Sequence, residues 1–221
     1  MNLSTQTLNM LEMGIFETLL MTFVSSFLAY LIGIPLGICL VVSAKDGIKP
    51  MPLLNIILGI IINILRSIPF IILLIMVLPL TRVMVGTTLG AKAVIPPLVI
   101  AAAPYIARMV ESSLKEVDAG VIEAAKSMGA SNFQIVWKVL LPEATPSLLL
   151  GAAISITTIL GYSAMAGFTG GGGLGTIAIN YGYYRYQTDV MLITVAILVI
   201  IVQIIQETWM YLSRRGDKRV R

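Results

Sequence analysis

The sequence is built around blocks of apolar residues that are long enough to cross a lipid bilayer. The first block, residues 18–44, carries no charged side chain. A helix needs about 20 mainly apolar residues to cross a hydrocarbon core of about 30 Å. Charged residues make up 12% of the chain and hydrophobic residues 57%, whereas a soluble domain has roughly 25% charged residues. The composition therefore excludes a soluble globular domain and predicts an all-α integral membrane protein.

Five apolar blocks are predicted to span the membrane. They are residues 18–44, 51–80, 89–110, 146–166 and 190–212. The second block is interrupted only by Arg66, and the third contains prolines that are expected to kink it. The remaining segments are a tail at 1–14, a loop at 111–145 inside one membrane domain at 15–212, and a basic tail at 213–221.

The basic residues predict the orientation of these spans. With the N-terminus outside, the inner segments hold 11 of the 15 lysines and arginines, the outer segments hold 3, and Arg66 lies in a span. Cytoplasmic loops carry an excess of lysine and arginine. The first tail has no basic residue, so a cleaved signal peptide is not expected. The sequence therefore predicts a multi-pass protein of the cell inner membrane, with its N-terminus outside and its C-terminus in the cytoplasm.

The composition also disfavours most catalytic and metal sites. The chain contains no histidine, which is the commonest general base and metal ligand. Its single cysteine, Cys39, cannot form an internal disulfide or a cysteine cluster. No basic patch is interleaved with aromatic residues, as nucleic-acid binding would need. We therefore expect no catalytic residue, no metal, no bound cofactor and no nucleic-acid partner, but contact with membrane lipid.

The polar loop between the third and fourth spans is predicted to form two short helices. Asp118 is suited to cap the first, and Gly129 fits the left-handed position that ends a helix. Ser131 and Gln134 have the spacing of a capping box for the second helix, which is expected to stop before Pro142. Periodicity alone leaves two interpretations open: a docking element on the inner face, or an amphipathic loop on the membrane surface.

The same loop carries a motif with several fixed positions. It reads Glu-Ala-Ala-x3-Gly-x9-Val-x-Leu-Pro, formed by Glu123, Ala124, Ala125, Gly129, Val139, Leu141 and Pro142. The motif resembles the EAA loop of ABC-importer permeases, which has isoleucine where this chain has Val139. The resemblance implies a type I ABC-importer permease fold. It also implies that the other six residues couple the chain to an ATPase.

The resemblance to these permeases further implies a set of partners. The chain is expected to form a homodimer that binds two cytosolic ABC ATPase subunits. An extracytoplasmic substrate-binding protein or lipoprotein would deliver the substrate. ATP would be bound and hydrolysed by the ATPase, so the chain itself is expected to be a transport subunit and not an enzyme.

A run of glycines follows the fourth span. It consists of Gly170, Gly171, Gly172, Gly173 and Gly175. The spacing imitates a dinucleotide-binding fingerprint, but the run follows an apolar helix instead of a strand. We therefore predict a flexible or re-entrant outer loop over residues 167–182. The run resembles the methionine-importer permeases in particular, which implies transport of a small amino acid, most simply L- or D-methionine.

A polar stripe in the second span is the candidate translocation path. Asn55, Asn63 and Arg66 fall on one helical face, with Ser67 beside it. An arginine inside a span is expensive to insert and normally faces a cavity or a partner. The alternative is a structural arginine bonded to backbone carbonyls that the nearby prolines expose. The stretch from Arg66 to Pro69 resembles a motif of amino-acid ABC permeases.

Two other functions remain open at this point. One is an ABC permease for another small polar substrate, and the other is an ion-coupled secondary transporter. The second needs acidic or histidine relays inside the membrane, whereas Glu17 and Glu207 lie at predicted span ends. The glycine pair Gly33 and Gly37 in the first span predicts a close helix contact, either between two copies or, more simply, within the chain.

Overall fold

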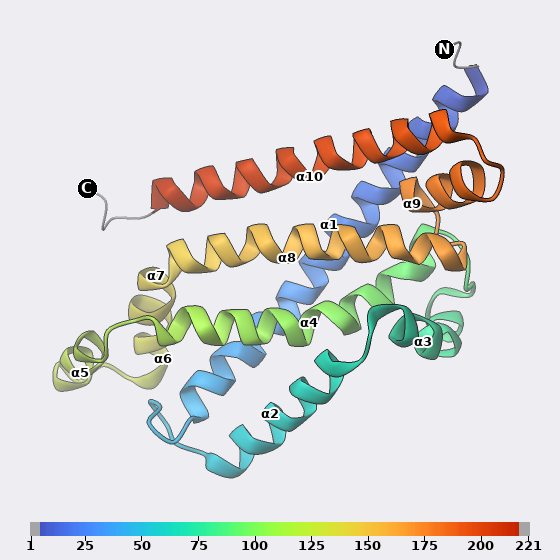
Figure 1. The fold of residues 1–221 in the computed structure, drawn as a ribbon. Coiled ribbons are helices and arrows are strands. Elements are labelled where there is room, and N and C mark those ends of the chain that lie inside the picture. Colours follow the sequence, from blue (N-terminus) through green and yellow to red (C-terminus); the bar gives the residue numbers. More distant parts are fainter. Residues whose placement is uncertain (1–4, 217–221) are drawn as a thin grey trace. The chain divides into compact units, whose positions relative to one another are not determined.

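The computed structural model describes residues 5–216, and every regular element in that part of the chain is helical. The longest helices can be followed in Figure 1. They are α1 (Thr5–Ser43), α4 (Ala91–Lys115), α8 (Thr145–Met165) and α10 (Thr188–Gly216). Each of these is long and apolar enough to cross a membrane. The predicted all-α membrane protein is therefore confirmed.

Shorter helices connect the long ones. Between α1 and α4 lie α2 (Pro52–Ser67) and α3 (Phe70–Val85). Between α4 and α8 lie α5 (Ala119–Ser127), α6 (Asn132–Ile135), the π-helix η1 (Val136–Leu140) and α7 (Leu141–Glu143). Between α8 and α10 lie the 3₁₀ helix η2 (Ala166–Thr169), α9 (Gly173–Ile177) and the π-helix η3 (Ala178–Tyr183).

The predicted second span, residues 51–80, is divided into α2 and α3. Each of these helices is too short to cross a membrane by itself, but the two together are long and apolar enough. The described chain therefore has four candidate spans, or five if this pair counts as one. The break falls at Pro69, which has no backbone N–H and disfavours helical geometry at Ile68. The predicted first span also differs, because α1 already begins at Thr5.

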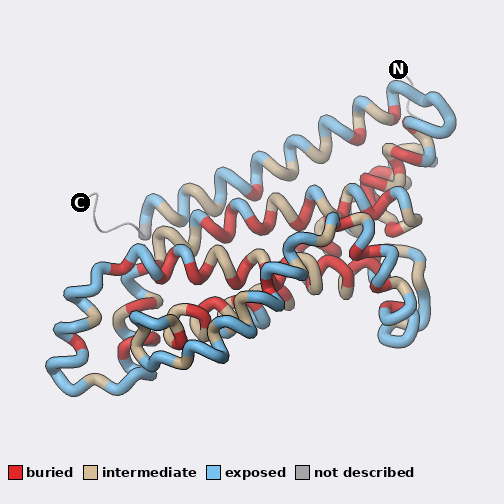
Figure 2. Tube along the Cα trace, turned by 60° about the horizontal axis from the view of Figure 1, so that its bottom comes forward, coloured by how far each residue is buried: buried red, intermediate tan, exposed pale blue. Residues whose placement is uncertain are grey.

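The helices group into two compact units. The first comprises residues 5–29, 68–102 and 156–206, and the second comprises 30–67, 103–155 and 207–216. The core of the first unit includes Leu11, Leu174, Ile177 and Val190 from α1, α9 and α10. The core of the second includes Leu40, Ile62 and Ala107 from α1, α2 and α4. Figure 2 shows that buried and exposed positions alternate along the helices.

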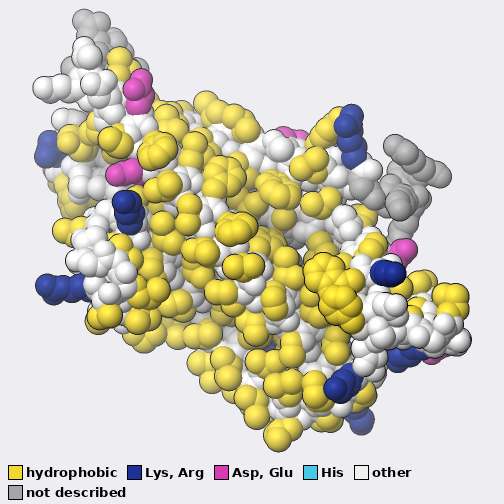
Figure 3. All heavy atoms as spheres, turned by 180° about the vertical axis from the view of Figure 1, so that it is seen from behind, with side chains coloured by type: hydrophobic (Ala, Val, Ile, Leu, Met, Phe, Trp, Pro, Cys, Tyr) yellow, Lys and Arg dark blue, Asp and Glu magenta, His cyan; other side chains and the backbone are white. Residues whose placement is uncertain are grey.

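Large apolar side chains also lie on the surface. Hydrophobic groups cover most of the face that Figure 3 shows. Helix α2 is an example, because Leu53, Ile56 and Ile64 are each more than half exposed. Continuous apolar surface of this kind is rare on soluble monomers and marks contact with lipid or with another protein.

The glycine pair of α1 packs against the chain's own helix α4. A Cβ atom added to Gly33 would lie 2.6 Å from Cγ2 of Ile106, and one added to Gly37 would lie 2.7 Å from the carbonyl oxygen of Ala107. Real Cβ atoms essentially never make contacts this short. The contact within the chain, one of the two predicted alternatives, is therefore present.

We predict that Gly37→Ala lowers thermal stability, because the added methyl group overlaps α4 and overpacking costs about 1–3 kcal/mol. Gly161→Ala in α8 is the matched control, since no atom lies within 4 Å of the added Cβ. The control should be neutral or slightly stabilising, because alanine favours helix by up to about 1 kcal/mol over glycine. Thermal unfolding of both variants in detergent tests this, and equal melting temperatures contradict the packing argument.

Candidate functional site

Helix α5 has the local structure that the sequence predicts. The carboxylate of Asp118 accepts a hydrogen bond from the Gly120 amide at 2.7 Å, which caps the helix at its start. Gly129 adopts a φ of +78° just beyond its end, and the Ala130 amide donates to the carbonyl of Ala125 at 3.1 Å. This is the left-handed helix termination that glycine favours. Both predicted ends of the first helix are confirmed.

The second helix of the loop begins as predicted but ends later. Ser131 and Gln134 form a complete capping box at the start of α6. The prediction that the helix stops before Pro142 is wrong, because α6, η1 and α7 follow one another to Glu143. The backbone changes from π-helix to α-helix at Leu141, so Pro142 lies in the first turn of α7. A proline is tolerated there because its missing N–H has no partner to lose.

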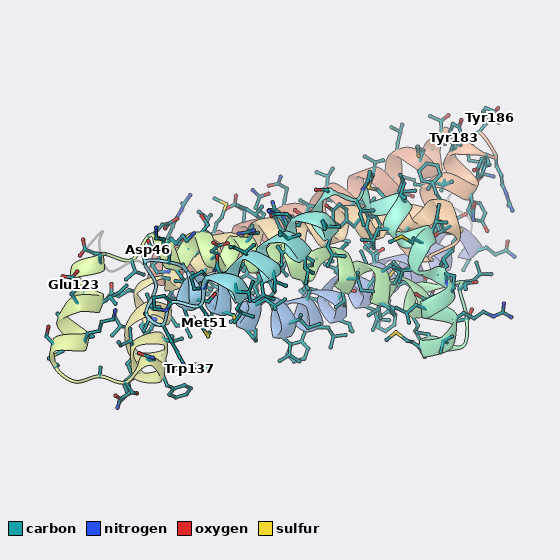
Figure 4. The ribbon with its side chains drawn as sticks, turned by 90° about the horizontal axis from the view of Figure 1, so that it is seen from below. Asp46, Met51, Glu123, Trp137, Tyr183 and Tyr186 are labelled. Atoms are coloured by element: carbon teal, nitrogen blue, oxygen red, sulfur yellow. The ribbon has the colours of Figure 1, made fainter. Side chains whose placement is uncertain are left out.

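The EAA motif residues differ in their exposure. Glu123 and Ala124 are exposed on α5, whereas Ala125 is 4% exposed. Helix α5 packs against α6 and η1, and Figure 4 places Glu123 at the end of the second unit that is formed by α5. Pro142 is exposed and Leu141 is half-buried. A partner approaching α5 would therefore meet Glu123 and Ala124, while Ala125 packs within the chain.

The polar stripe of α2 is partly used inside the chain. The amide of Asn55 donates to the carbonyl oxygen of Leu40 at 2.7 Å and to Oγ of Ser43 at 3.0 Å, which ties α2 to α1. The side-chain oxygen of Asn63 accepts a hydrogen bond from Nη2 of Arg108 at 3.0 Å. The same Nη2 donates to the carbonyl of Gly59 at 3.2 Å. Much of the stripe thus faces the chain's own helices α1 and α4.

Arg66 and Ser67 are exposed at the end of α2. Arg66 lies in the last turn, where a cation is favoured by the helix dipole. Within residues 5–216 its guanidinium makes no hydrogen bond or ion pair. Ser67 donates to the carbonyl of Asn63 at 2.8 Å. Arg66 is therefore an available cation at the break between α2 and α3.

The predicted site did not include a cluster of charged side chains that lies at the end of α4. Nη1 of Arg108 lies 2.6 Å from Oε2 of Glu111, and Nζ of Lys115 lies 2.8 Å from Oε1 of the same carboxylate. Glu111 is only 8% exposed. The i, i+3 and i+4 spacing of these residues could have predicted the ion pairs. Their link to Asn63 and Gly59 of α2 could not be predicted, because it depends on how the helices pack.

The glycine run packs against α1 and leads into α9. Gly170, Gly172 and Gly173 have φ values of +75°, +77° and +70°. The Gly173 amide donates to Oε2 of Glu17 at 2.6 Å, and the Leu174 amide donates to Oγ1 of Thr18 at 2.9 Å. Helix α1 therefore supplies acceptors for the first amides of α9. Both amides are therefore already hydrogen-bonded within the chain.

Close packing explains the other glycines of the run. A Cβ on Gly171 would meet the side chain of Val94 at 2.6 Å, and one on Gly175 would meet the backbone of Ala164. The Gly90 amide also donates to the carbonyl of Gly170 at 2.9 Å. The contact of Glu17 with this segment could not be predicted from its place at a predicted span end, because the two lie far apart in the sequence. Among residues 5–216, no group of three or more His, Cys, Asp or Glu side chains could hold a metal ion.

Residues 33–216 match the family described as the binding-protein-dependent transport system inner membrane component. The chain belongs to this family. It is therefore a membrane component of a transport system, in agreement with the predicted permease function. The family also favours this function over an ion-coupled secondary transporter, because transport in the family depends on a binding protein.

Among curated proteins, the chain is similar to permeases of methionine transport systems. The chain is 47% identical over 203 residues to the probable D-methionine transport system permease protein MetI of Vibrio cholerae, covering 92% of this chain and 90% of that one. It is 52% identical over 158 residues to the D-methionine transport system permease protein MetI of Escherichia coli strain K12, covering 72% and 73% of the two chains.

Solved structures share the fold of this family member. A chain from inward-facing conformations of the MetNI methionine ABC transporter is 47% identical with a TM-score of 0.96, covering 98% of this chain and 100% of that one. A chain from an amino acid ABC transporter with histidines has a TM-score of 0.77 at 20% identity, covering 97% and 100%, which shows the fold alone. The predicted type I ABC-importer permease fold is confirmed.

For this permease we predict that Glu111→Ala lowers the free energy of unfolding by about 1–3 kcal/mol, because it leaves the partly buried guanidinium of Arg108 unpaired. Lys115→Ala is the control. The Lys115 side chain is 55% exposed, and an exposed ion pair contributes about 0–1 kcal/mol. Thermal unfolding in detergent compares the two variants. A loss for Lys115→Ala as large as that for Glu111→Ala contradicts the ranking.

Proposed function

We propose that the chain is the permease subunit of an ATP-driven importer of methionine, in its L form, its D form or both. The observation that carries this proposal is the likeness to the MetNI chain, which extends over 98% of this chain and the whole of that one at 47% identity. Relatives with names of D-methionine permeases support the same substrate. Uptake of radiolabelled L- and D-methionine by the reconstituted transporter tests the proposal. Preference for another small polar substrate would contradict it.

The working complex is a homodimer of this chain with two cytosolic ABC ATPase subunits. An extracytoplasmic substrate-binding protein or lipoprotein delivers the amino acid. The description of the structural neighbour as an ABC transporter supports the ATPase partners. The exposed apolar surface of α2 supports burial against lipid or a second copy. ATP is bound by the ATPase, so the permease carries no cofactor of its own.

The permease lies in the inner membrane with its N-terminus outside and its C-terminus in the cytoplasm. The excess of lysine and arginine on the inner side of the predicted topology supports this orientation. It places α5 in the cytoplasm, where the ATPase is. Residues 217–221 of the basic C-terminal tail lie outside the described part of the chain.

In this arrangement α5 is the coupling helix. The exposed Glu123 and Ala124 face the ATPase, and the tight turn at Gly129 returns the chain to α6. From Asn132 to Glu143 the backbone is helical without interruption, and α8 follows after Ala144. Leu141 and Pro142 therefore lie in a nearly continuous helical connection from α6 to α8. Movement of α5 by the ATPase would pass directly into a span.

The end of α2 contributes to the translocation path. The available guanidinium of Arg66, with Ser67 beside it, offers a positive charge and a hydroxyl group to the carboxylate of an amino acid. Asn63 is held by Arg108, which fixes the wall next to Arg66. Asn55 supports the same helix through its hydrogen bonds to α1. Outside, the packed glycine run from Gly170 to Gly175 forms a rigid part of the outer end.

We predict that Gly129→Val abolishes methionine uptake, whereas Gly129→Asn retains most of it. No atom lies within 4 Å of a Cβ built on Gly129, so the effect within the chain comes from its φ of +78°. Left-handed geometry costs most residues about 1–2 kcal/mol, while asparagine tolerates it better. Uptake and ATPase activity are measured in proteoliposomes, and normal uptake by the valine variant contradicts the role of the turn.

A crosslinking measurement separates docking from folding. In a Cys39→Ala background, a cysteine at position 124 should crosslink to the ATPase, whereas one at position 125 should not. The reason is that Ala124 is exposed and Ala125 is 4% exposed. The pair differs by one residue and therefore controls for the distance of α5 from the ATPase. Equal crosslinking at both positions contradicts the assigned docking face.

We predict that Arg66→Ala reduces uptake by about 10- to 100-fold, since a hydrogen bond to a charged group contributes about 1.5–3 kcal/mol. Arg66→Lys should retain part of the activity. Arg82→Ala is the matched control, because Arg82 occupies the last turn of α3, which has the same length of 16 residues as α2. If Arg66→Ala transports normally but melts earlier, the structural alternative is correct.

A further inference from the structure

Two aromatic side chains are exposed on the helix that follows α5. Phe133 is 70% exposed and Trp137 is 56% exposed. They are one turn apart, and their ring centroids lie 5.9 Å from each other. Lys138 is exposed beside them. The EAA motif contains neither aromatic residue, so the proposed coupling role of α5 leaves this aromatic pair unexplained.

The opposite side of the same helix is buried in the protein. Ile135 and Leu140 are 0% exposed and Val136 is 7% exposed. The helix is therefore amphipathic and fixed by its buried side, and it presents the aromatic pair outward. The buried side holds the helix in place, so the exposed aromatic side can face either lipid or another protein.

The position of the helix relates it to the membrane. Figures 1 and 4 show α6 and η1 lying close to the ends of α4 and α8, with α5 farther from these spans. In Figure 1 the helix from α6 to α7 runs across the direction of α8. Trp137 precedes Thr145, the first residue of α8, by eight residues. At 1.5 Å per helical residue the two are at most about 12 Å apart along the chain.

We propose that α6 and η1 lie in the phospholipid headgroup region of the bilayer, with Phe133 and Trp137 as an aromatic anchor. Tryptophan is enriched at this depth because its ring is apolar and its indole N–H is polar. Lysine beside it suits the negative surface of the cytoplasmic leaflet. The choice of leaflet rests on the proposed function, which places the loop in the cytoplasm.

The anchor gives the coupling loop two separate surfaces. Helix α5 presents Glu123 and Ala124 toward the ATPase, and the aromatic pair holds the next helix against lipid. The connection from α6 to α8 is then supported by the bilayer near its middle. A displacement of α5 would turn this connection about the anchor instead of lifting it away from the membrane.

The test is the depth of nitroxide labels in the assembled transporter. Single cysteines at positions 133 and 137 are labelled in a Cys39→Ala background, in nanodiscs of phosphatidylethanolamine and phosphatidylglycerol. Position 128 is the matched control, because Met128 is an exposed apolar residue of the same loop, and position 150 is the reference within a candidate span, because Leu150 is an exposed apolar residue of α8. Collisions with oxygen report lipid, and collisions with the nickel complex of EDDA report water.

Labels at 133 and 137 should show a ratio of oxygen to nickel collisions above that at 128 and at or below that at 150, with or without the ATPase. The label at 128 should be accessible to nickel when the ATPase is absent. The proposal is overturned if 133 and 137 behave like 128. It is also overturned if they are shielded from both reagents only when the ATPase binds, which would make the pair an ATPase contact.

A second measurement keeps the native aromatic residues. Trp209→Phe leaves Trp137 as the single tryptophan of the chain. In nanodiscs without the ATPase, its fluorescence should be quenched by brominated lipids and protected from iodide, and the reverse result contradicts the anchor. Methionine uptake and the crosslink from position 124 test the proposed function independently. A failed anchor with an intact crosslink therefore overturns this inference alone.

Discussion

The structure depends on one constraint of the membrane: each backbone N–H and C=O in the hydrocarbon must find a partner inside the protein. Long helices meet this requirement within themselves, which explains why α1, α4, α8 and α10 are continuous. Where the helical pattern is interrupted, the chain supplies other partners. At the glycine run, Glu17 and Thr18 of α1 accept the amides of Gly173 and Leu174. The irregular backbone is thus tolerated because it is buried in protein.

In the second unit, a charged side chain also has its partners inside the protein. Arg108 lies where α4 approaches α2, and its guanidinium is paired with Glu111 and bonded to Asn63 and Gly59. The side chain of Arg108 therefore links α2, which ends at the proposed path, to α4, which leads into the proposed coupling loop. This link gives a physical reason why a movement of the proposed coupling loop would also move the proposed path.

The loop from α5 to α7, the proposed coupling loop, is compact because each of its turns is specified locally. Asp118 caps α5, Gly129 ends it, and Ser131 with Gln134 begins α6. The π-helical turn η1 then accommodates Pro142 without a break. The proposed rigid transmission from α5 to α8 and the proposed aromatic anchor both depend on this continuity.

The sequence by itself determined the membrane class, the long apolar helices, the caps of α5 and α6 and the EAA motif. These depend on composition and on contacts within a few residues. It misplaced the end of the second loop helix, and it did not predict the partners of Asn55, Asn63, Arg108 and Gly173. These depend on residues distant in the chain: Leu40 for Asn55, Gly59 for Arg108 and Glu17 for Gly173. Only tertiary packing decides such contacts, because local spacing contains no information about which helix lies beside which.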